Sequence, residues 1–162
     1  MRREHRCREK GNISVELGLT MPLLLLLVAG TLDFGMLFWE KHILTNAVRE
    51  GARAAARAGV SGSAEQTQTQ VRQIVQDYLN RFNIKDDNGN NLVLGAANFS
   101  YTWTMGGSGT TLTVSLLQIP YRMMLLPNAR NIFFGTGHGG PAVFNLTAAT
   151  TMAAEWVTAP TL

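Results

Sequence analysis

NISVELGLTMPLLLLLVAGTLDFGMLFW (residues 12–39) is the stretch that decides the fold, because only Glu16 and Asp33 interrupt its uncharged side chains. A run of this length and composition is typical of a membrane-spanning helix. As a helix it would be about 42 Å long, against a hydrocarbon core of about 30 Å. We therefore expect a transmembrane helix whose distal part emerges on the far side of the membrane.

The leader before this stretch holds the whole excess of positive charge. Among residues 1–11, five side chains are basic and two are acidic, so the leader accounts for the formal net charge of +3. By the positive-inside tendency the leader should stay cytoplasmic and the C-terminal part should face outward. A nucleic-acid-binding protein would carry its basic residues on the folded domain, so we expect no nucleic-acid partner. The single cysteine, Cys7, excludes an intrachain disulfide.

Three interpretations of the leader and the apolar run stay open on these residues alone. A secretory signal peptide would be cut near Ala29, but Glu16 and the apolar sequence that continues beyond the cut argue against it. In a plain single-span anchor, Glu16 would be an interfacial acid that reaches the headgroups. In the third interpretation, GNISVE (residues 11–16) is a processing site, with a cut between Gly11 and Asn12.

This processing site resembles the leader of type IV prepilins and their pseudopilin relatives. In that family a prepilin peptidase cuts on the cytoplasmic side and leaves the apolar helix in the membrane. Cleavage would create an α-amino group on Asn12, which is mostly cationic at neutral pH because its unperturbed pKa is about 7.7 to 8.0. Glu16 could neutralise the amine of a neighbouring subunit, since an unpaired carboxylate in a helix bundle is costly. Asp33 is either an interfacial acid or a second subunit-pairing residue.

The residues after the span carry a more specific resemblance. LDFG (residues 32–35) is followed by LTNAVREGARAAA (residues 44–56), which has no proline and is rich in helix-forming residues. With the leader and span, these motifs over residues 11–59 resemble the TadE family of pilus-assembly proteins, minor pseudopilins of the tight-adherence (Flp-type) pilus. Major pilins of that system usually place an aromatic residue after the glutamate. Leu17 follows Glu16 here, which favours a minor subunit.

The resemblance implies a single-pass protein of the bacterial inner membrane that takes part in pilus biogenesis and is not an enzyme. Its implied partners are a prepilin peptidase, other pilin and pseudopilin subunits, the pilus assembly platform and membrane lipid.

Three arginines form one stripe on the second half of the expected helix, because Arg49, Arg53 and Arg57 recur every four residues, and Glu50 could pair with Arg53. The stripe is either a solvated or lipid-snorkelling face or a contact with another subunit. Gly51 and the neighbouring alanines would let another helix approach closely. Arg49, Glu50, Gly51 and Arg53 are therefore candidate helix-interface residues.

The next segments predict a helix and a β-hairpin. Residues 63–84 show the spacing of an amphipathic helix, with Ser63 and Gln66 as a capping box. Residues 98–105 and 111–116 alternate apolar with hydroxyl side chains on either side of a glycine-rich turn. This alternation predicts a β-hairpin with one apolar face.

Two further segments complete the expected sheet. Residues 92–94 are a candidate strand, and residues 143–156 are expected to give the last one. Helices followed by antiparallel strands indicate an α+β head in which the amphipathic helix packs on a small antiparallel sheet, similar to pilin heads in layout. We therefore expect a cytoplasmic leader (residues 1–11), a helix that extends out of the membrane (residues 12–59) and a periplasmic head (residues 60–162).

Residues 120–141 predict an apolar loop with two possible roles. It is either a flap over the core or an exposed patch for a partner or the membrane surface. The apolar side chains of this loop are Met123, Met124, Leu125, Leu126, Phe133 and Phe134.

The sequence contains no complete motif for binding a cofactor or a metal ion. The glycine-rich residues 135–140 have dinucleotide-binding spacing but precede Pro141 instead of a helix. Residues 86–91 superficially resemble a calcium loop, but its sixth position is Asn91 instead of glycine and its twelfth is Ala97 instead of glutamate, so a turn is expected. No histidine has metal-ligand spacing, and no serine or cysteine lies in a nucleophile motif. We therefore predict no cofactor, no metal and no catalytic residue.

A protein of another class fits the same residues. It would be an uncleaved single-pass envelope protein whose head binds a periplasmic ligand or protein. Such a protein would tolerate Gly11→Leu, whereas a pseudopilin should fail at this change because a bulky residue before the cut should not fit the peptidase.

Overall fold

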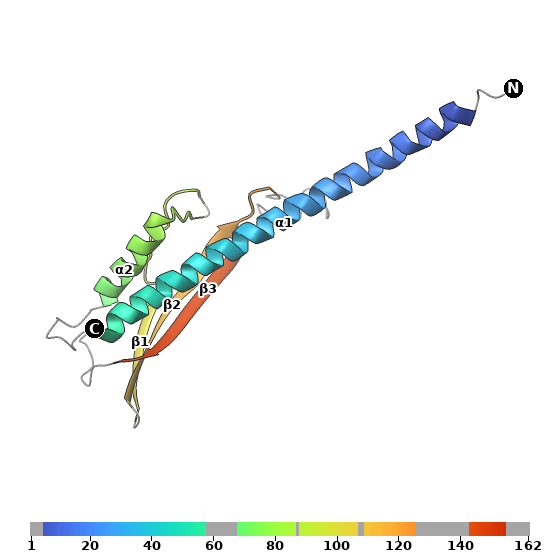
Figure 1. Cartoon of the computed structure of the whole chain (residues 1–162). Helices are drawn as coiled ribbons and strands as arrows, with labels where there is room; N and C mark the ends of the chain where they lie inside the picture. Colours follow the sequence, from blue (N-terminus) through green and yellow to red (C-terminus); the bar gives the residue numbers. More distant parts are fainter. Residues whose placement is uncertain (1–4, 58–67, 87, 107–108, 126–142, 155–162) are drawn as a thin grey trace.

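The computed structural model describes residues 5–57, 68–86, 88–106, 109–125 and 143–154. Within these ranges it contains the helices α1 (His5–Arg57) and α2 (Gln68–Arg81) and the strands β1 (Phe99–Gly106), β2 (Gly109–Arg122) and β3 (Val143–Ala153), arranged as in Figure 1. A long apolar helix, a second helix and a small antiparallel sheet confirm the predicted α+β class.

Helix α1 is continuous over 53 residues and includes Pro22. It begins inside the leader and ends at Arg57, close to the predicted end. Its most apolar 18-residue window is not buried at all within the chain, and the helix is long and apolar enough to cross a membrane. Thr31 donates its hydroxyl hydrogen to the Leu27 carbonyl at 2.9 Å, so this polar group is satisfied inside the helix. Figure 1 shows this half of α1 projecting away from the head.

The sheet has the order β1-β2-β3 with antiparallel neighbours. On its inner face Tyr101 lies opposite Val114, and both side chains are buried. On its outer face the Thr113 and Thr151 hydroxyls are hydrogen-bonded at 2.8 Å. The predicted hairpin with one apolar face is therefore confirmed.

Strand β2 is longer than the sequence pattern predicted. Its register shifts between Leu116 and Ile119, where Gln118 has a φ of 52°, and this bulge returns Ile119 to the core. Residues 120–122 then continue β2 and pair with β3, so the prediction that the loop begins at residue 120 is wrong. Pro120 is tolerated because β1 pairs with β2 only as far as Leu116, which leaves β2 with one neighbour beyond that point.

The candidate strand at residues 92–94 is the other wrong assignment, because this segment forms no strand and joins no sheet. Gln76 of α2 binds it instead. The Gln76 Nε2 donates to the Leu92 carbonyl and the Oε1 accepts from the Leu94 N–H, both at 2.7 Å. A side-chain amide thus takes the place of a neighbouring strand, which the Leu-Val-Leu alternation could not show.

Helix α2 confirms the predicted amphipathic pattern, since Val71, Val75 and Leu79 are its buried residues, although the helix ends at Arg81 instead of residue 84. It packs mainly against α1, which lies between α2 and the sheet, and not on the sheet as predicted (Figure 1). The predicted capping box at Ser63 and Gln66 lies outside the described residues.

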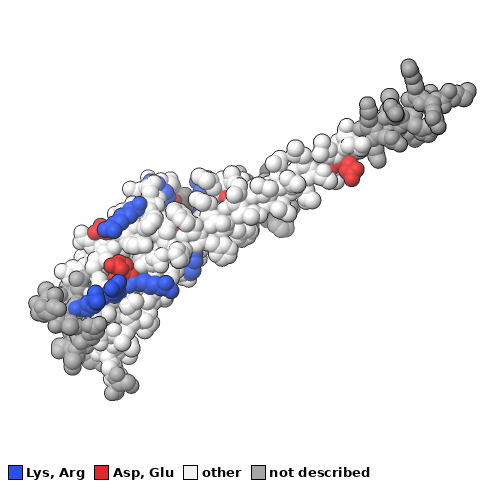
Figure 2. All heavy atoms as spheres, in the orientation of Figure 1, with Lys and Arg blue, Asp and Glu red and all other residues white. Residues whose placement is uncertain are grey.

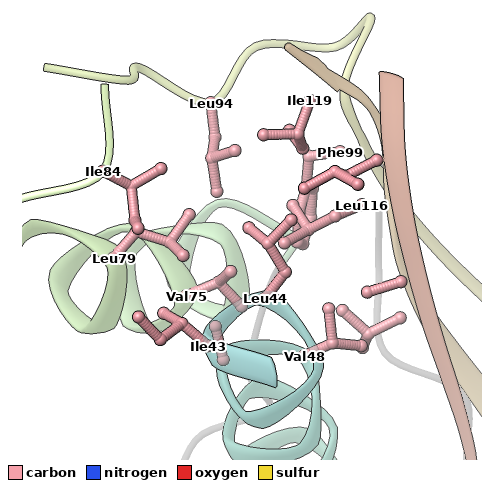
Figure 3. Packing of buried hydrophobic residues seen from close by; sticks show 14 of the residues in the cluster. Ile43, Leu44, Val48, Val75, Leu79, Ile84, Leu94, Phe99, Leu116 and Ile119 are labelled. Carbon is pink, nitrogen blue, oxygen red and sulfur yellow. The ribbon is translucent and has the colours of Figure 1, made fainter. Parts of the chain in front are cut away.

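The core of the head lies on both sides of the second half of α1. Figure 3 shows Leu44 and Val48 of α1 between Val75 of α2 and Leu116 of β2. The described buried apolar residues of α1 are Ile43, Leu44, Ala47, Val48, Ala52, Ala55 and Ala56. The helix that leaves the apolar segment is therefore also the central element of the head.

Gly51 permits the closest approach of α2 to α1. A Cβ atom added at this position would lie 2.5 Å from Val75 Cγ2, and valine has one strongly preferred rotamer in a helix. Overpacking of this kind costs about 1–3 kcal/mol, partly offset by about 1 kcal/mol of helix propensity gained by alanine. We expect Gly51→Ala to lower the free energy of unfolding of the head by about 1 kcal/mol in denaturant titrations.

Gly35→Ala is the matched control, because an added Cβ at this position meets no heavy atom within 4 Å. This variant should be as stable as the parent or slightly more so. Adding Val75→Ala to Gly51→Ala should relieve the overlap at the contact. Equal stability of the Gly51→Ala and Gly35→Ala variants would contradict the packing described for α1 and α2.

Candidate functional site

The predicted processing and pairing residues lie on the part of α1 that projects from the head. Gly11 and Asn12 are consecutive residues of the helix, and Glu16 follows about one turn later with an exposed side chain. Figure 2 shows an acidic group among uncharged side chains along this part of the molecule. A carboxylate on an apolar helix surface is costly in lipid unless it finds a cationic partner. Within this chain, the Glu16 side chain is exposed on the apolar part of α1.

Asp33 lies where α1 meets the head, and its side chain is only 1% exposed. Its Oδ1 accepts hydrogen bonds from the backbone N–H groups of Met124 at 3.1 Å and Leu125 at 2.9 Å. Its Oδ2 accepts from the Leu125 N–H at 3.2 Å. Hydrogen bonds to an ionised acceptor are stronger than neutral ones, so this carboxylate ties the segment after β2 to α1.

Tyr121, the second-to-last residue of β2, also contacts Asp33. Its hydroxyl donates to the Asp33 backbone carbonyl at 3.1 Å. Burial raises the pKa of the Tyr121 hydroxyl above its usual range, and the negative charges of Asp33 and Glu40 raise it further. The phenol therefore keeps its proton and remains a donor at neutral pH. We call Asp33, Tyr121, Met124 and Leu125 the junction.

The sequence identified Asp33 as a candidate pairing residue but did not indicate which groups of the same chain it binds. Those partners are 91 and 92 residues further along, so no local pattern links them. The signal that could have raised the question is a lone carboxylate at the end of an apolar run, followed much later by a strand that ends in apolar residues.

Removing the hydroxyl group from either of two buried tyrosines in the sheet should change the free energy of unfolding in opposite directions. Tyr101 Oη is buried and has no hydrogen-bond partner among the described residues, and burial raises its pKa, so it stays neutral. Tyr101→Phe should raise the free energy of unfolding by about 1 kcal/mol because it removes an unsatisfied polar group. Tyr121→Phe should lower it by about 1 kcal/mol because it removes the bond to Asp33. Denaturant titration of both variants checks the pair, and changes of the same sign would contradict it.

A cavity of about 590 Å³ opens beside the junction. It lies between α1, the turn after α2 and the end of β2. Its lining is mainly apolar and includes Trp39, while Lys85 and Arg122 contribute positive charge and Glu40 and Asp86 contribute negative charge.

The candidate helix-interface residues divide between two environments. Arg49, Glu50 and Arg53 are exposed, whereas Gly51 is buried against α2. The close approach of another helix at Gly51 is therefore made by α2 of the same chain. A smaller groove of about 250 Å³ lies beside Glu50 and is lined on α2 by residues including Asp77 and Arg81. The exposed charges form the part of this set that another subunit could contact.

Asp86 organises a turn, as predicted for residues 86–91. Its Oδ1 accepts hydrogen bonds from the backbone N–H groups of Asn88 at 3.0 Å and Asn90 at 2.7 Å. In the part of the chain that the structure describes, no group of three or more His, Cys, Asp or Glu residues is placed to hold a metal ion. The glycine-rich residues 135–140 lie outside the described ranges.

Comparison with known proteins gives one match. The model of the family described as TadE-like protein matches residues 11–53. The match begins at the glycine of the predicted processing site, contains Glu16 and Asp33, and ends at Arg53. No curated protein and no solved structure matches the chain. Over residues 11–53 the chain is therefore similar to the TadE-like family, a pilus-associated family, which confirms the resemblance drawn from the motifs.

Proposed function

We propose that this chain is a minor pseudopilin that takes part in biogenesis of a tight-adherence (Flp-type) pilus. A prepilin peptidase cuts after Gly11, α1 anchors the protein in the inner membrane and the head faces the periplasm. The observation that carries the proposal is the TadE-like match over residues 11–53, which coincides with an exposed apolar helix. The basic leader supports a cytoplasmic N-terminus.

Cleavage would change the charges at the end of α1 in two ways. It would remove the leader, which carries the formal net charge of +3, and it would create a cationic amine on Asn12. Asn12 and Glu16 are four residues apart, so their axial separation in a helix is about 6 Å. A neighbouring helix displaced by this amount would bring its amine level with Glu16, and the pair would fix the register between subunits.

The pairing proposal rests on Glu16 more than on Asp33. The Asp33 carboxylate accepts backbone hydrogen bonds from Met124 and Leu125, and pairing with another subunit would have to displace or share them. Arg49, Glu50 and Arg53 are exposed on the head end of α1, where they could contact neighbouring pilin or pseudopilin subunits and the assembly platform.

Gly11→Leu tests the processing step. We expect the variant to accumulate in the membrane as an uncut precursor and to fail to restore pili in a host that lacks the parent gene. Gly18→Leu is the matched control, because position 18 lies in the same helix and an added Cβ there meets no heavy atom within 4 Å. Normal piliation with an uncut Gly11→Leu protein would instead favour an uncleaved envelope protein with a ligand-binding head.

A further inference from the structure

Exposed apolar side chains of the head gather where it meets α1. Among the described residues outside α1, seven large hydrophobic side chains are exposed, and four of them come from the segment just after β2 and the beginning of β3. These four, which we call the base of the head, are Met124, Leu125, Val143 and Phe144. Met124 is 75% exposed and Leu125 is 50% exposed. Apolar patches of this kind mark an interaction site more often than ordinary surface.

The junction fixes the base at one level along α1. Residues 13–32 form the uncovered apolar segment, and 20 helical residues span about 30 Å, the thickness of the hydrocarbon core. Asp33 is the next residue, and its carboxylate holds the backbone of Met124 and Leu125. Figure 1 shows the end of β2 and the beginning of β3 beside the point where α1 leaves the head. With residues 13–32 in the hydrocarbon core, the base would lie at the outer boundary of that core.

The helix itself is suited to an interface at this level. Phe34, Phe38 and Trp39 are exposed on α1 just after Asp33, and tryptophan is enriched where membrane meets water. Arg122 and Lys85 line the adjacent cavity and could reach lipid phosphates with their apolar stems against the interface. Glu40 and Asp86 line the same cavity and balance the charges of Lys85 and Arg122. Attraction of this surface to lipid would therefore come from its apolar side chains.

We propose that the base of the head is seated in the outer-leaflet interface of the membrane, with Met124 and Leu125 inserted at the boundary between headgroups and acyl chains. The ligand of this surface is lipid. This inference rests on the proposed membrane span of α1 and adds to it that the head docks on the bilayer in a fixed orientation, because Asp33 couples the base to the helix. A head seated in this way would present the Arg49 and Arg53 end of α1 away from the membrane.

Fluorescence of a site-specific label tests the seating in the full chain reconstituted into phosphatidylglycerol and phosphatidylethanolamine vesicles. In a Cys7→Ser background, Met124→Cys carries an environment-sensitive dye, and the quenchers are two sets of lipids, one brominated on the acyl chain near the headgroup and one brominated near the end of the acyl chain. Thr111→Cys is the matched water-facing control, since Thr111 is exposed near the opposite end of β2. Leu24→Cys, within the apolar segment, reports on the span itself.

We expect a shift of the emission to shorter wavelength and at least twofold quenching at position 124, with neither at position 111. Emission at 124 that matches position 111, while position 24 is quenched by lipid, would overturn the seating and leave the span intact. A shifted but unquenched signal at 124 that disappears on dilution with lipid would also overturn it, in favour of a second copy covering the base. Failure of quenching at position 24 would contradict both the proposed membrane span of α1 and the seating of the base.

Discussion

Asp33→Ala should lower the free energy of unfolding of the head by about 2–4 kcal/mol, the largest stability effect expected from any single side chain in the junction. The substitution removes the acceptor of the Met124 and Leu125 N–H groups. Hydrogen bonds to charged groups contribute about 1.5–3 kcal/mol each, and this substitution removes the shared acceptor of two donors. Denaturant titration in detergent, followed by near-ultraviolet circular dichroism, measures the change.

Asp33→Asn provides the control for this prediction. The amide keeps one carbonyl oxygen as an acceptor in nearly the same shape, so it should lose less stability than alanine. Limited proteolysis should also cut the segment after β2 faster in Asp33→Ala than in the parent. A loss below about 0.5 kcal/mol, the range of ordinary surface substitutions, would show that Asp33 does not hold the head to α1.

Glu16→Gln should abolish pilus assembly while leaving cleavage and membrane insertion normal. The variant keeps the shape of the side chain but cannot neutralise the Asn12 amine of a neighbouring subunit. Removing one partner of a buried ion pair costs about 3–5 kcal/mol, which corresponds to a loss of at least about 100-fold in the affinity of one contact. Counting pili by electron microscopy and probing the membrane fraction for the processed protein measure both parts of the prediction.

Glu16→Asp separates charge from shape in the same position. It keeps the negative charge on a shorter side chain and should retain more assembly than Glu16→Gln. If Glu16→Gln assembles pili as the parent does, the carboxylate has no pairing role. If both variants fail to be cleaved, Glu16 acts at the peptidase instead of between subunits.

The fold was largely predictable because its elements carry strong local patterns. The apolar run of residues 12–39, the apolar spacing of α2 and the alternation of β1 and β2 each indicate one type of element. The errors fall where long-range contacts decide. The bulge at Gln118 extends β2 through Pro120, and the side chain of Gln76 takes the place of a strand next to Leu92. Neither arrangement has a local signature.

The candidate site was predictable in its residues more than in its contacts. The lone acids Glu16 and Asp33 stand out in an apolar sequence, and Gly51 stands out among alanines. Sequence reasoning did not show that Gly51 packs on Val75 of the same chain, or that Asp33 binds the backbone after β2. These contacts join segments far apart in the sequence. Their geometry depends on how the head folds back along α1.

The intact mass and N-terminal residue of the protein recovered from membranes of its own host test pseudopilin processing most directly. We predict a chain that begins at Asn12 and retains the apolar segment of α1. A chain that begins at Met1 would contradict prepilin processing and leave an uncut anchor. A chain that begins near Thr31 would contradict it as well, because an ordinary signal peptide would then have been removed and the head released from the membrane.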